Sequence, residues 1–336
     1  MPEITYRPLG ASALKVSPLC LGAMMFGGVT DEPTSRRIVS RAWDARINFI
    51  DTADVYNDGA SEEVVGRAIA PHRDDWVVAT KFGYGGGSGP NRGGQSAKWI
   101  MRAVEGSLRR LHTDYLDILY FHRPAPDQPF EEGLRTIGNL IRAGKVRYYG
   151  VSNFKGLQIV ELCRLADALG IPRPVISQPL YNISDRGAEV EQIPAASHCG
   201  LGVVPYSPLA RGVLSGKYTP DTAPPEGSRA ARGDRRMQQT EWRAESLYLA
   251  QAVAERAATL GISSIDYSIG WVLRNRAVSA AIAGPRTEDQ WEAYLKAMTV
   301  TLPDEEETFV DGLVRPGHAS TPGYTDPSYP VAGRMV

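Results

Sequence analysis

The sequence predicts a single (β/α)8 barrel, the TIM-barrel architecture, with an N-terminal β-hairpin and long loops at the C-terminal face of its strands. Short runs rich in Val, Ile, Leu and Tyr recur along the 336 residues and alternate with amphipathic helical patterns. Most runs lack polar alternation, which is typical of parallel strands buried on both faces. Most also end in a polar residue, as expected for a polar site at a barrel mouth. We therefore expect residues 1–336 to form one domain.

The hairpin is predicted for residues 4–22, where two short alternating stretches flank the turn sequence Gly10-Ala11-Ser12. Eight apolar runs predict the barrel strands. They span residues 18–21, 47–50, 76–80, 116–121, 146–151, 175–177, 202–206 and 278–283.

Helical spacing of apolar residues predicts the helices between these strands. The clearest candidates are residues 33–45, 96–112, 129–145, 155–170, 243–261 and 264–275. Two of them end in glycine, at Gly170 and Gly261, and a third ends in Gly144-Lys145, which are common helix-stop signals. A further helix is expected to open at the sequence Ser61-Glu62-Glu63.

Three segments fit neither pattern. Residues 83–94 are glycine-rich but do not match the G-x-G-x-x-G fingerprint of an open dinucleotide-binding sheet, so we interpret them as a mobile loop on the active face. Residues 217–242 are polar and rich in Pro and Gly, a composition typical of functional or disordered loops. Residues 315–336 form a tail without helix, which either covers the barrel mouth or contacts a neighbouring subunit.

Charge and cysteine content limit the possible classes of protein. The net charge is −1 and basic residues are scattered, so we expect no nucleic-acid partner. The three cysteines lie far apart without C-x-x-C spacing, which argues against disulfides and a thiolate zinc site. The five histidines also lack metal-ligand spacing, so we expect no metal. Without a signal peptide or an apolar run long enough for a membrane span, we expect a cytoplasmic protein.

Three successive predicted strands end in residues with complementary acid–base chemistry. These are Asp51, Lys81 and His122, and Tyr56 follows in the loop after Asp51. Each residue alone is more often structural, but neighbouring strands would bring the four together. A lysine ammonium lowers the pKa of a nearby tyrosine, and an aspartate holds the lysine charged. The group suits protonation of a developing oxyanion by Tyr56.

The sequence resembles the aldo-keto reductases over nearly its whole length. The resemblance rests on LGAMMFG, DTADVYNDGASEEVVGRAI, VVATKFG, SLRRLHTDYLDILYFHRP, GKVRYYGVSNF, QPLYNISDR, YSPLARGVLSGKY and AGPRTEDQ. It implies a (β/α)8 barrel that reduces carbonyls with NADPH. The family's catalytic Asp, Tyr, Lys and His correspond to Asp51, Tyr56, Lys81 and His122.

The resemblance also implies where NADPH (or NADP+) binds. Ser152, Asn153 and Gln178 would hold the carboxamide, and Tyr206 would stack on the nicotinamide. The segment along the pyrophosphate contains Ser207, Leu209, Gly212 and Lys217, and Arg286 with Gln290 would enclose the 2′-phosphate. The remaining implied cofactor contacts are Ala23, Met24, Asp51 and Gly284. An arginine suits a phosphate because its planar fork donates two hydrogen bonds, which favours NADPH over NADH.

Two positions depart from many relatives. Tyr294 stands where an adenine-facing Asn is common, and Arg123 replaces a Trp beside the catalytic His. We expect the substrate pocket to include Met25, Tyr56, His122 and Arg123, with Met24 and Met25 forming an adaptable apolar wall.

We therefore expect an NADPH-dependent reductase of a small-molecule carbonyl substrate, acting as a monomer or homodimer away from membranes. The main alternative is an NADPH-binding regulatory subunit, as in relatives that are partners of channels. A metal-dependent barrel hydrolase is a weaker alternative because metal-ligand spacing is missing. The sequence does not indicate which carbonyl is reduced, because substrate choice depends on variable loops.

Overall fold

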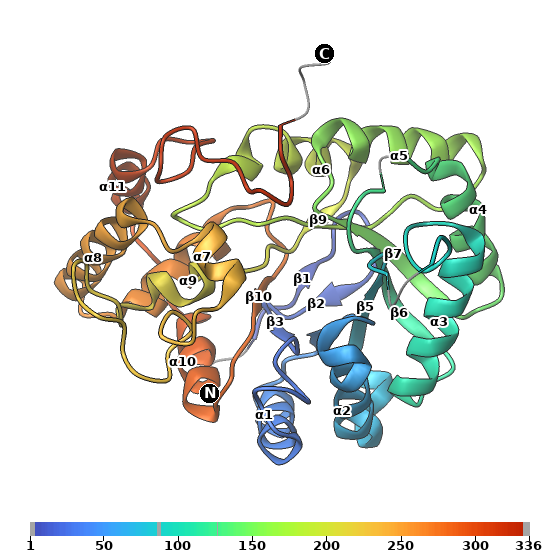
Figure 1. Cartoon of the computed structure of the whole chain (residues 1–336), viewed down its shortest axis with the longest axis horizontal. Helices are drawn as coiled ribbons and strands as arrows, with labels where there is room; N and C mark the ends of the chain where they lie inside the picture. Colours follow the sequence, from blue (N-terminus) through green and yellow to red (C-terminus); the bar gives the residue numbers. More distant parts are fainter. Residues whose placement is uncertain (1–3, 86–88, 126, 332–336) are drawn as a thin grey trace. The chain divides into compact units, whose positions relative to one another are not determined.

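The computed structural model describes residues 4–85, 89–125 and 127–331 (Figure 1). The chain forms two compact units. The first comprises Met1–Pro179, Glu191–Tyr206 and Arg276–Leu295, and the second comprises Leu180–Val190, Ser207–Asn275 and Lys296–Val336. That the whole chain acts as one domain stays a prediction.

The first unit contains a complete barrel. Its eight parallel strands follow the order β10-β3-β4-β5-β6-β7-β8-β9. They are β3 (Leu19–Gly22), β4 (Phe49–Asp51), β5 (Val77–Phe82), β6 (Leu116–Phe121), β7 (Val146–Ser152), β8 (Ile176–Gln178), β9 (Gly202–Val203) and β10 (Ala281–Ala283). Two parallel bridges, Val203 to Val278 and Tyr206 to Ile282, join the β9 segment to the β10 segment and close the ring. The predicted fold class is thus confirmed, and each of the eight predicted runs contains or overlaps a strand.

The predicted hairpin is also present, as β1 (Arg7–Pro8) paired antiparallel with β2 (Lys15–Val16). Its buried side chains Leu9 and Val16 belong to the same apolar cluster as barrel residues such as Val77 and Ile118. Gly10 is needed in this turn, because a Cβ there would lie 2.4 Å from the backbone oxygen of Gly200. The hairpin therefore fills one end of the barrel interior.

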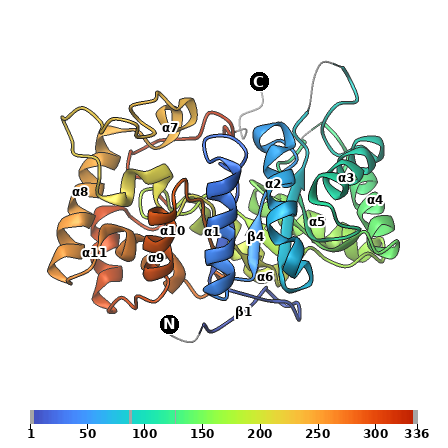
Figure 2. The same ribbon diagram turned by 90° about the horizontal axis from the view of Figure 1, so that it is seen from below.

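Helices of the first unit pack outside the strands, and α1 and α2 run side by side (Figure 2). They are α1 (Glu32–Asp44), α2 (Ala60–Ile69), α3 (Ala97–Leu111), α4 (Phe130–Arg142), α5 (Gly156–Ala168) and α6 (Gln192–Cys199), and α10 (Glu288–Ala297) extends into the second unit. The sequence missed α6 and α10, which are short and only weakly patterned.

The second unit is built from α7 (Arg235–Thr240), α8 (Ala244–Thr259), α9 (Ser264–Arg274) and α11 (Glu305–Leu313). The expectation of an irregular segment at 217–242 was wrong in part, because α7 forms there. Asp234 caps α7 by accepting from the Met237 amide, and the Met237 side chain is fully buried.

The other irregular segments agree with expectation where they are described. Residues 315–331 contain no helix or strand, and residues 332–336 lie outside the described part. The loop at 83–94 likewise has no helix or strand in its described residues, and residues 86–88 lie outside them. Among the helices of the described chain, none is both long and apolar enough to cross a membrane.

Candidate active site

Strand alternation points the candidate residues into the barrel. Side chains two apart on a strand share a face, so Asp51 follows the buried interior residue Phe49, and Lys81 follows Ala79. His122 and Gln178 continue the interior rows of Tyr120 and Ile176 in the same way. The four polar side chains therefore form the next layer above the apolar interior, at the C-terminal ends of β4, β5, β6 and β8.

Lys81 is the centre of this layer. Its side chain is fully buried, and its ammonium pairs with the Asp51 carboxylate. The same nitrogen donates to the Thr52 carbonyl at 2.7 Å and to the Tyr56 hydroxyl at 3.3 Å. Asp51 also accepts from the Gln178 side-chain amide at 2.9 Å, so its carboxylate is stabilised by Lys81 and by Gln178. The structure thus brings together Asp51, Tyr56 and Lys81 as the sequence predicts.

The turn after β4 aims Tyr56 at Lys81. Asn57 and Asp58 adopt left-handed backbone conformations, with φ of 49° and 55°, which these two residue types tolerate better than most. The Asn57 amide fixes the turn by donating to the carbonyls of Met24, at 3.0 Å, and Phe26, at 2.8 Å. The sequence Tyr-Asn-Asp-Gly is therefore suited to this turn.

His122 completes the group. Its ring meets the ring of Tyr56 edge to face, with centroids 5.8 Å apart. The side chain is buried, and its Nδ1 has no hydrogen-bond partner among the described residues. Burial lowers the pKa of His122 well below its usual value, and the charges of Lys81 and Arg123 lower it further. The ring is consequently neutral near pH 7 and can donate one hydrogen bond.

The expected pKa shift of Tyr56 had the wrong direction. Lys81 does lower the pKa, but burial raises it by more, and Asp51 raises it as well. Burial by itself would lower the pKa of Lys81, whereas Asp51 and Tyr56 raise it above its usual value. At neutral pH the lysine is therefore charged and the tyrosine keeps its proton.

A second polar cluster lies beside His122. The Asn153 side-chain amide donates to the His122 backbone carbonyl and to the Ser152 hydroxyl, both at 3.0 Å. The Tyr206 hydroxyl donates to the side-chain Oδ1 of Asn153 at 2.8 Å. Ser152 donates to the Gln178 carbonyl at 2.9 Å. Hydroxyl and amide groups of this kind fit a carboxamide, which needs both donors and acceptors. The four predicted carboxamide and ring contacts therefore lie together.

The predicted pyrophosphate residues Ser207, Leu209, Gly212 and Lys217 belong to the second unit. Within it, Ser207, Ala210, Arg211 and Gly212 all have positive φ, a backbone form that occurs in anion-binding concavities. A Cβ on Gly212 would lie 3.1 Å from the Lys217 ammonium. A cation beside such a backbone fits a phosphate.

The predicted 2′-phosphate residues lie at the start of α10. The Arg286 amide donates to the Gln290 side-chain oxygen at 2.8 Å, and the Thr30 hydroxyl donates to the Arg286 carbonyl at 3.2 Å. Gly284 leaves room at the end of β10, because a Cβ there would come no closer than 3.5 Å to the Gly22 oxygen. Tyr294 lies on α10 itself, eight residues after Arg286. Their contacts with an adenosine stay predictions.

The remaining predicted residues follow β3 and β6 at the same end of the barrel strands. Ala23 is buried just after β3, and Met24 is exposed next to it. Arg123 is exposed beside His122 and stacks on Tyr84, a residue that the sequence did not single out. The sequence signal for Tyr84 was weak, because it lies just after Gly83 in the glycine-rich loop. Met25 is partly buried between Met24 and Phe26.

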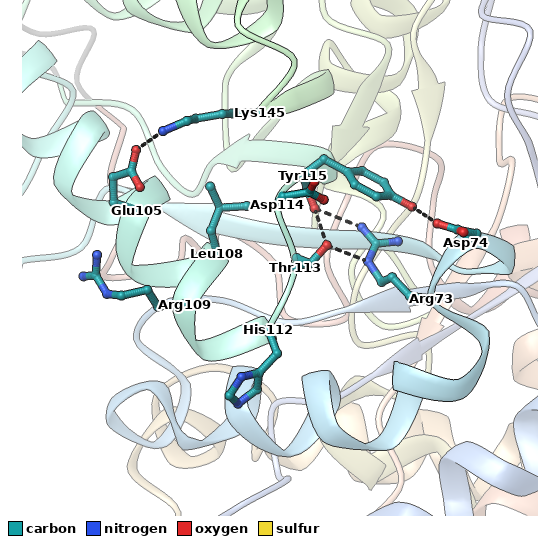
Figure 3. Close-up of a pocket in the computed structure, with 10 residues that line it drawn as sticks. All are labelled: Arg73, Asp74, Glu105, Leu108, Arg109, His112, Thr113, Asp114, Tyr115 and Lys145. Carbon is teal, nitrogen blue, oxygen red and sulfur yellow. Dashed lines mark hydrogen bonds and ion pairs between the residues drawn. The ribbon is translucent and has the colours of Figure 1, made fainter.

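A surface hollow of about 740 Å³ lies elsewhere in the first unit (Figure 3). Its lining comes from the segments before β5, β6 and β7, which is the end of the strands opposite the tetrad. Its charges are largely satisfied: Arg73 pairs with Asp117 at 2.8 Å, and Lys145 pairs with Glu105. In barrel enzymes this end of the strands contributes to stability rather than to catalysis. Nothing there indicates a ligand.

Comparison with known proteins then places the chain. The model of the aldo/keto reductase family matches residues 18–315, which is most of the sequence. The chain belongs to the aldo/keto reductase family. Aldo/keto reductases are in general oxidoreductases that bind NAD(P)H, so membership supports an oxidoreductase activity and a nicotinamide cofactor of either kind. No group of three or more potential metal ligands occurs among the described residues of this family member.

Among individual relatives, some are named oxidoreductases and others potassium channel subunits. An uncharacterized oxidoreductase of Bacillus subtilis, YrpG, is 37% identical over 315 residues, covering 90% of this chain and 93% of that protein. A probable voltage-gated potassium channel subunit beta of Oryza sativa is 36% identical over 300 residues, covering 88% and 91%. A putative subunit of the same name in Schizosaccharomyces pombe is 33% identical over 306 residues, covering 88% of each.

Proposed function

We propose that this protein reduces an aldehyde or ketone to an alcohol with NADPH, in a reversible reaction. The observation that carries the proposal is the position of the buried Lys81 ammonium, which is bonded to Asp51 and Tyr56 at once. Family membership supports it, since all four residue types of the catalytic tetrad are present and three of them share hydrogen bonds.

Tyr56 is the proposed general acid. Its raised pKa keeps the phenol protonated at neutral pH, so a proton is available for the carbonyl oxygen as negative charge develops there. Lys81 stabilises the phenolate left behind, and Asp51 holds Lys81 charged and in place. The neutral His122 ring donates a hydrogen bond to the same oxygen and so orients the substrate.

Bound NADPH would supply the hydride that the carbonyl carbon accepts. The side chains of Ser152, Asn153 and Gln178 would bind the carboxamide, and Tyr206 would support the ring. The positive-φ segment after Tyr206, with Lys217, would bind the pyrophosphate. Arg286 would bind the 2′-phosphate. We further propose a cytoplasmic monomer or homodimer whose ligands are the cofactor and a small carbonyl compound.

Replacing Tyr56 by Phe tests the mechanism. The change removes the acidic hydroxyl but keeps the ring against His122. We expect kcat for aldehyde reduction to fall at least about 100-fold, the lower end of the range for general acid catalysis, while NADPH still quenches protein fluorescence normally. NADPH oxidation at 340 nm measures the first quantity. Wild-type turnover by Tyr56→Phe would refute the assignment.

A regulatory subunit is the second candidate. It is favoured by the names of the plant and fission-yeast relatives, which are called potassium channel subunits. The intact tetrad argues for turnover, since a purely regulatory role does not need the buried ion pair of Lys81 with Asp51. Steady-state NADPH oxidation with a panel of aldehydes decides between the two. Tight NADPH binding without turnover of any aldehyde would favour the regulatory role.

A further inference from the structure

The surroundings of His122 carry an inference about the substrate, which rests on the proposed reductase function. The tyrosine after β5 and the arginine after β6 lie at the same edge as the tetrad, since the strands pair in register from Ala79–Ile118 to Phe82–Phe121. The His122 amide continues this register by donating to the Phe82 carbonyl at 2.9 Å. Tyr84 and Arg123 therefore flank the catalytic histidine.

Arg123, Tyr84 and His122 form a continuous row of side-chain contacts. The Tyr84 ring meets the His122 ring edge to face, with centroids 4.7 Å apart. The guanidinium carbon of Arg123 lies 4.3 Å from the centroid of the Tyr84 ring. A guanidinium over an aromatic face is held by the attraction of the cation to the ring. Its hydrogen-bond donors lie in its own plane and stay available at the edges.

The guanidinium of Arg123 is not neutralised by a carboxylate within the described residues. The residue is exposed, and no carboxylate in the described part of the chain forms an ion pair with it. By contrast, most arginines on the described helices outside the barrel form an ion pair with a carboxylate. Arg67 on α2, for example, pairs with Glu32 at 2.8 Å. An unpaired guanidinium fixed by stacking beside a reactive group is suited to bind an anion from outside the chain.

The other charges of the catalytic layer cancel. Asp51 neutralises Lys81, Tyr56 keeps its proton, and the His122 ring is neutral. Arg123 therefore supplies the uncompensated positive charge next to the reacting group. Its field already reaches the ring of His122, whose pKa it lowers.

We propose that Arg123, stacked on Tyr84, binds an anionic group of the substrate, so that the preferred substrates are small aldehydes or ketones carrying a carboxylate or a phosphate. The planar fork accepts either oxyanion through two parallel hydrogen bonds. Arg123 is thus a specificity-determining residue, and Tyr84 is the positioning residue that holds it.

Matched substrate pairs test the proposal. One pair is 4-carboxybenzaldehyde and its uncharged methyl ester, and the other is glyceraldehyde 3-phosphate and glyceraldehyde. We expect wild-type kcat/KM to be about 10- to 100-fold higher for one anionic member than for its neutral partner, the range of a charge-assisted hydrogen bond. The pair that shows the preference identifies carboxylate or phosphate as the ligand.

Variants then assign the preference to Arg123. Arg123→Gln should lower kcat/KM for the anionic member at least tenfold more than for the neutral one, mainly through KM. Arg123→Lys should recover part of the preference, because it keeps the charge without the fork. Tyr84→Leu should weaken the preference, and Tyr84→Phe should keep it. Arg109→Gln, an exposed arginine on α3, is the matched control and should leave both substrates unchanged.

The outcomes separate this inference from the proposed function. Equal rates for charged and neutral members of both pairs, with turnover intact, would overturn the inference alone. An equal loss for both members in Arg123→Gln would also overturn it. Absence of turnover with every aldehyde would overturn the reductase function itself.

Discussion

Among single residues, burial rather than the nearest charge sets the protonation of Tyr56 and His122. Lys81 is hydrogen-bonded to Tyr56, yet the pKa of the phenol is raised, because removal of water disfavours the phenolate more than the ammonium favours it. The same removal of water keeps His122 neutral. A general acid must carry its proton at the working pH, so the raised pKa of Tyr56 suits reduction.

The pH profile of reduction follows from these directions. Tyr56 holds its proton up to pH values above about 10, its usual pKa, and His122 stays neutral above its usual value of about 6.5. We expect kcat/KM for a neutral aldehyde to be level between roughly pH 7 and 9 and to fall only at more alkaline pH. Initial rates across that range measure it. A fall centred near neutrality would contradict the assignment of Tyr56.

Cofactor preference depends on the proposed role of Arg286. If Arg286 binds the 2′-phosphate, Arg286→Ala removes a charge-assisted contact that only NADPH makes. We expect the Kd for NADPH to rise about 10- to 100-fold and the Kd for NADH to change less than threefold. Fluorescence titration with both nucleotides gives the comparison. Equal weakening of the two would exclude the 2′-phosphate role.

At the scale of elements, α2 is tied to the sheet by a buried acid. The sequence Ser61-Glu62-Glu63 looks like an ordinary helix start, but α2 begins at Ala60 and both Ser61 and Glu62 are fully buried. Glu62 accepts from Thr80 on β5 at 2.5 Å and from Arg110 on α3 at 2.7 Å. One carboxylate thus links two helices to the strand that carries Lys81.

Removing the cation from this ion pair should destabilise the fold. Arg110→Ala leaves the Glu62 carboxylate buried without its cation, and we expect the free energy of unfolding to fall by about 2–4 kcal/mol, since Arg110 is itself only partly buried. Arg109→Ala, at the neighbouring exposed position, is the control. Urea unfolding followed by circular dichroism measures both variants. A loss no larger than that of the control would show that the ion pair contributes little.

At the scale of the whole molecule, the tail is an integral part of the second unit. Arg236 on α7 donates to the Asp326 carboxylate through both terminal guanidinium nitrogens, at 3.1 and 2.6 Å. The guanidinium carbon of Arg243 lies 3.8 Å from the centroid of the Tyr324 ring. Backbone bonds add to this, including Ser320 to the Ser184 carbonyl at 2.9 Å. The tail is irregular in secondary structure, yet polar side chains fix its path within that unit.

Truncation tests this role. A chain that ends at residue 314 loses these contacts and leaves Arg236 and Arg243 without their partners in the tail. We expect its Tm to fall by at least about 2 °C, corresponding to a loss of one or more kcal/mol. A chain that ends at residue 331 keeps every contact described for the tail and should melt like the full chain. Equal melting of both truncations would refute a stabilising tail.

The fold class and the eight strands could be predicted from the sequence, and the four residues proposed as the tetrad could be singled out by residue type and by resemblance. Buried parallel strands read as uninterrupted apolar runs, and polar residues at their ends can only lie at one mouth of a barrel. Long amphipathic helices such as α3 and α4 were equally clear. Short helices such as α6 and α7 were not, because a few residues hold too little periodicity to predict.

The pKa shifts of the buried groups and the contacts between distant residues follow from the tertiary packing. The pKa of Tyr56 depends on how much water the folded barrel excludes, which no spacing in the sequence encodes. The burial of Glu62 depends on residues 18 and 48 positions away. The stack of Arg123 on Tyr84 depends on two strand ends meeting at one edge. Residue types could be predicted from the chain, but their surroundings arise only when distant segments pack together.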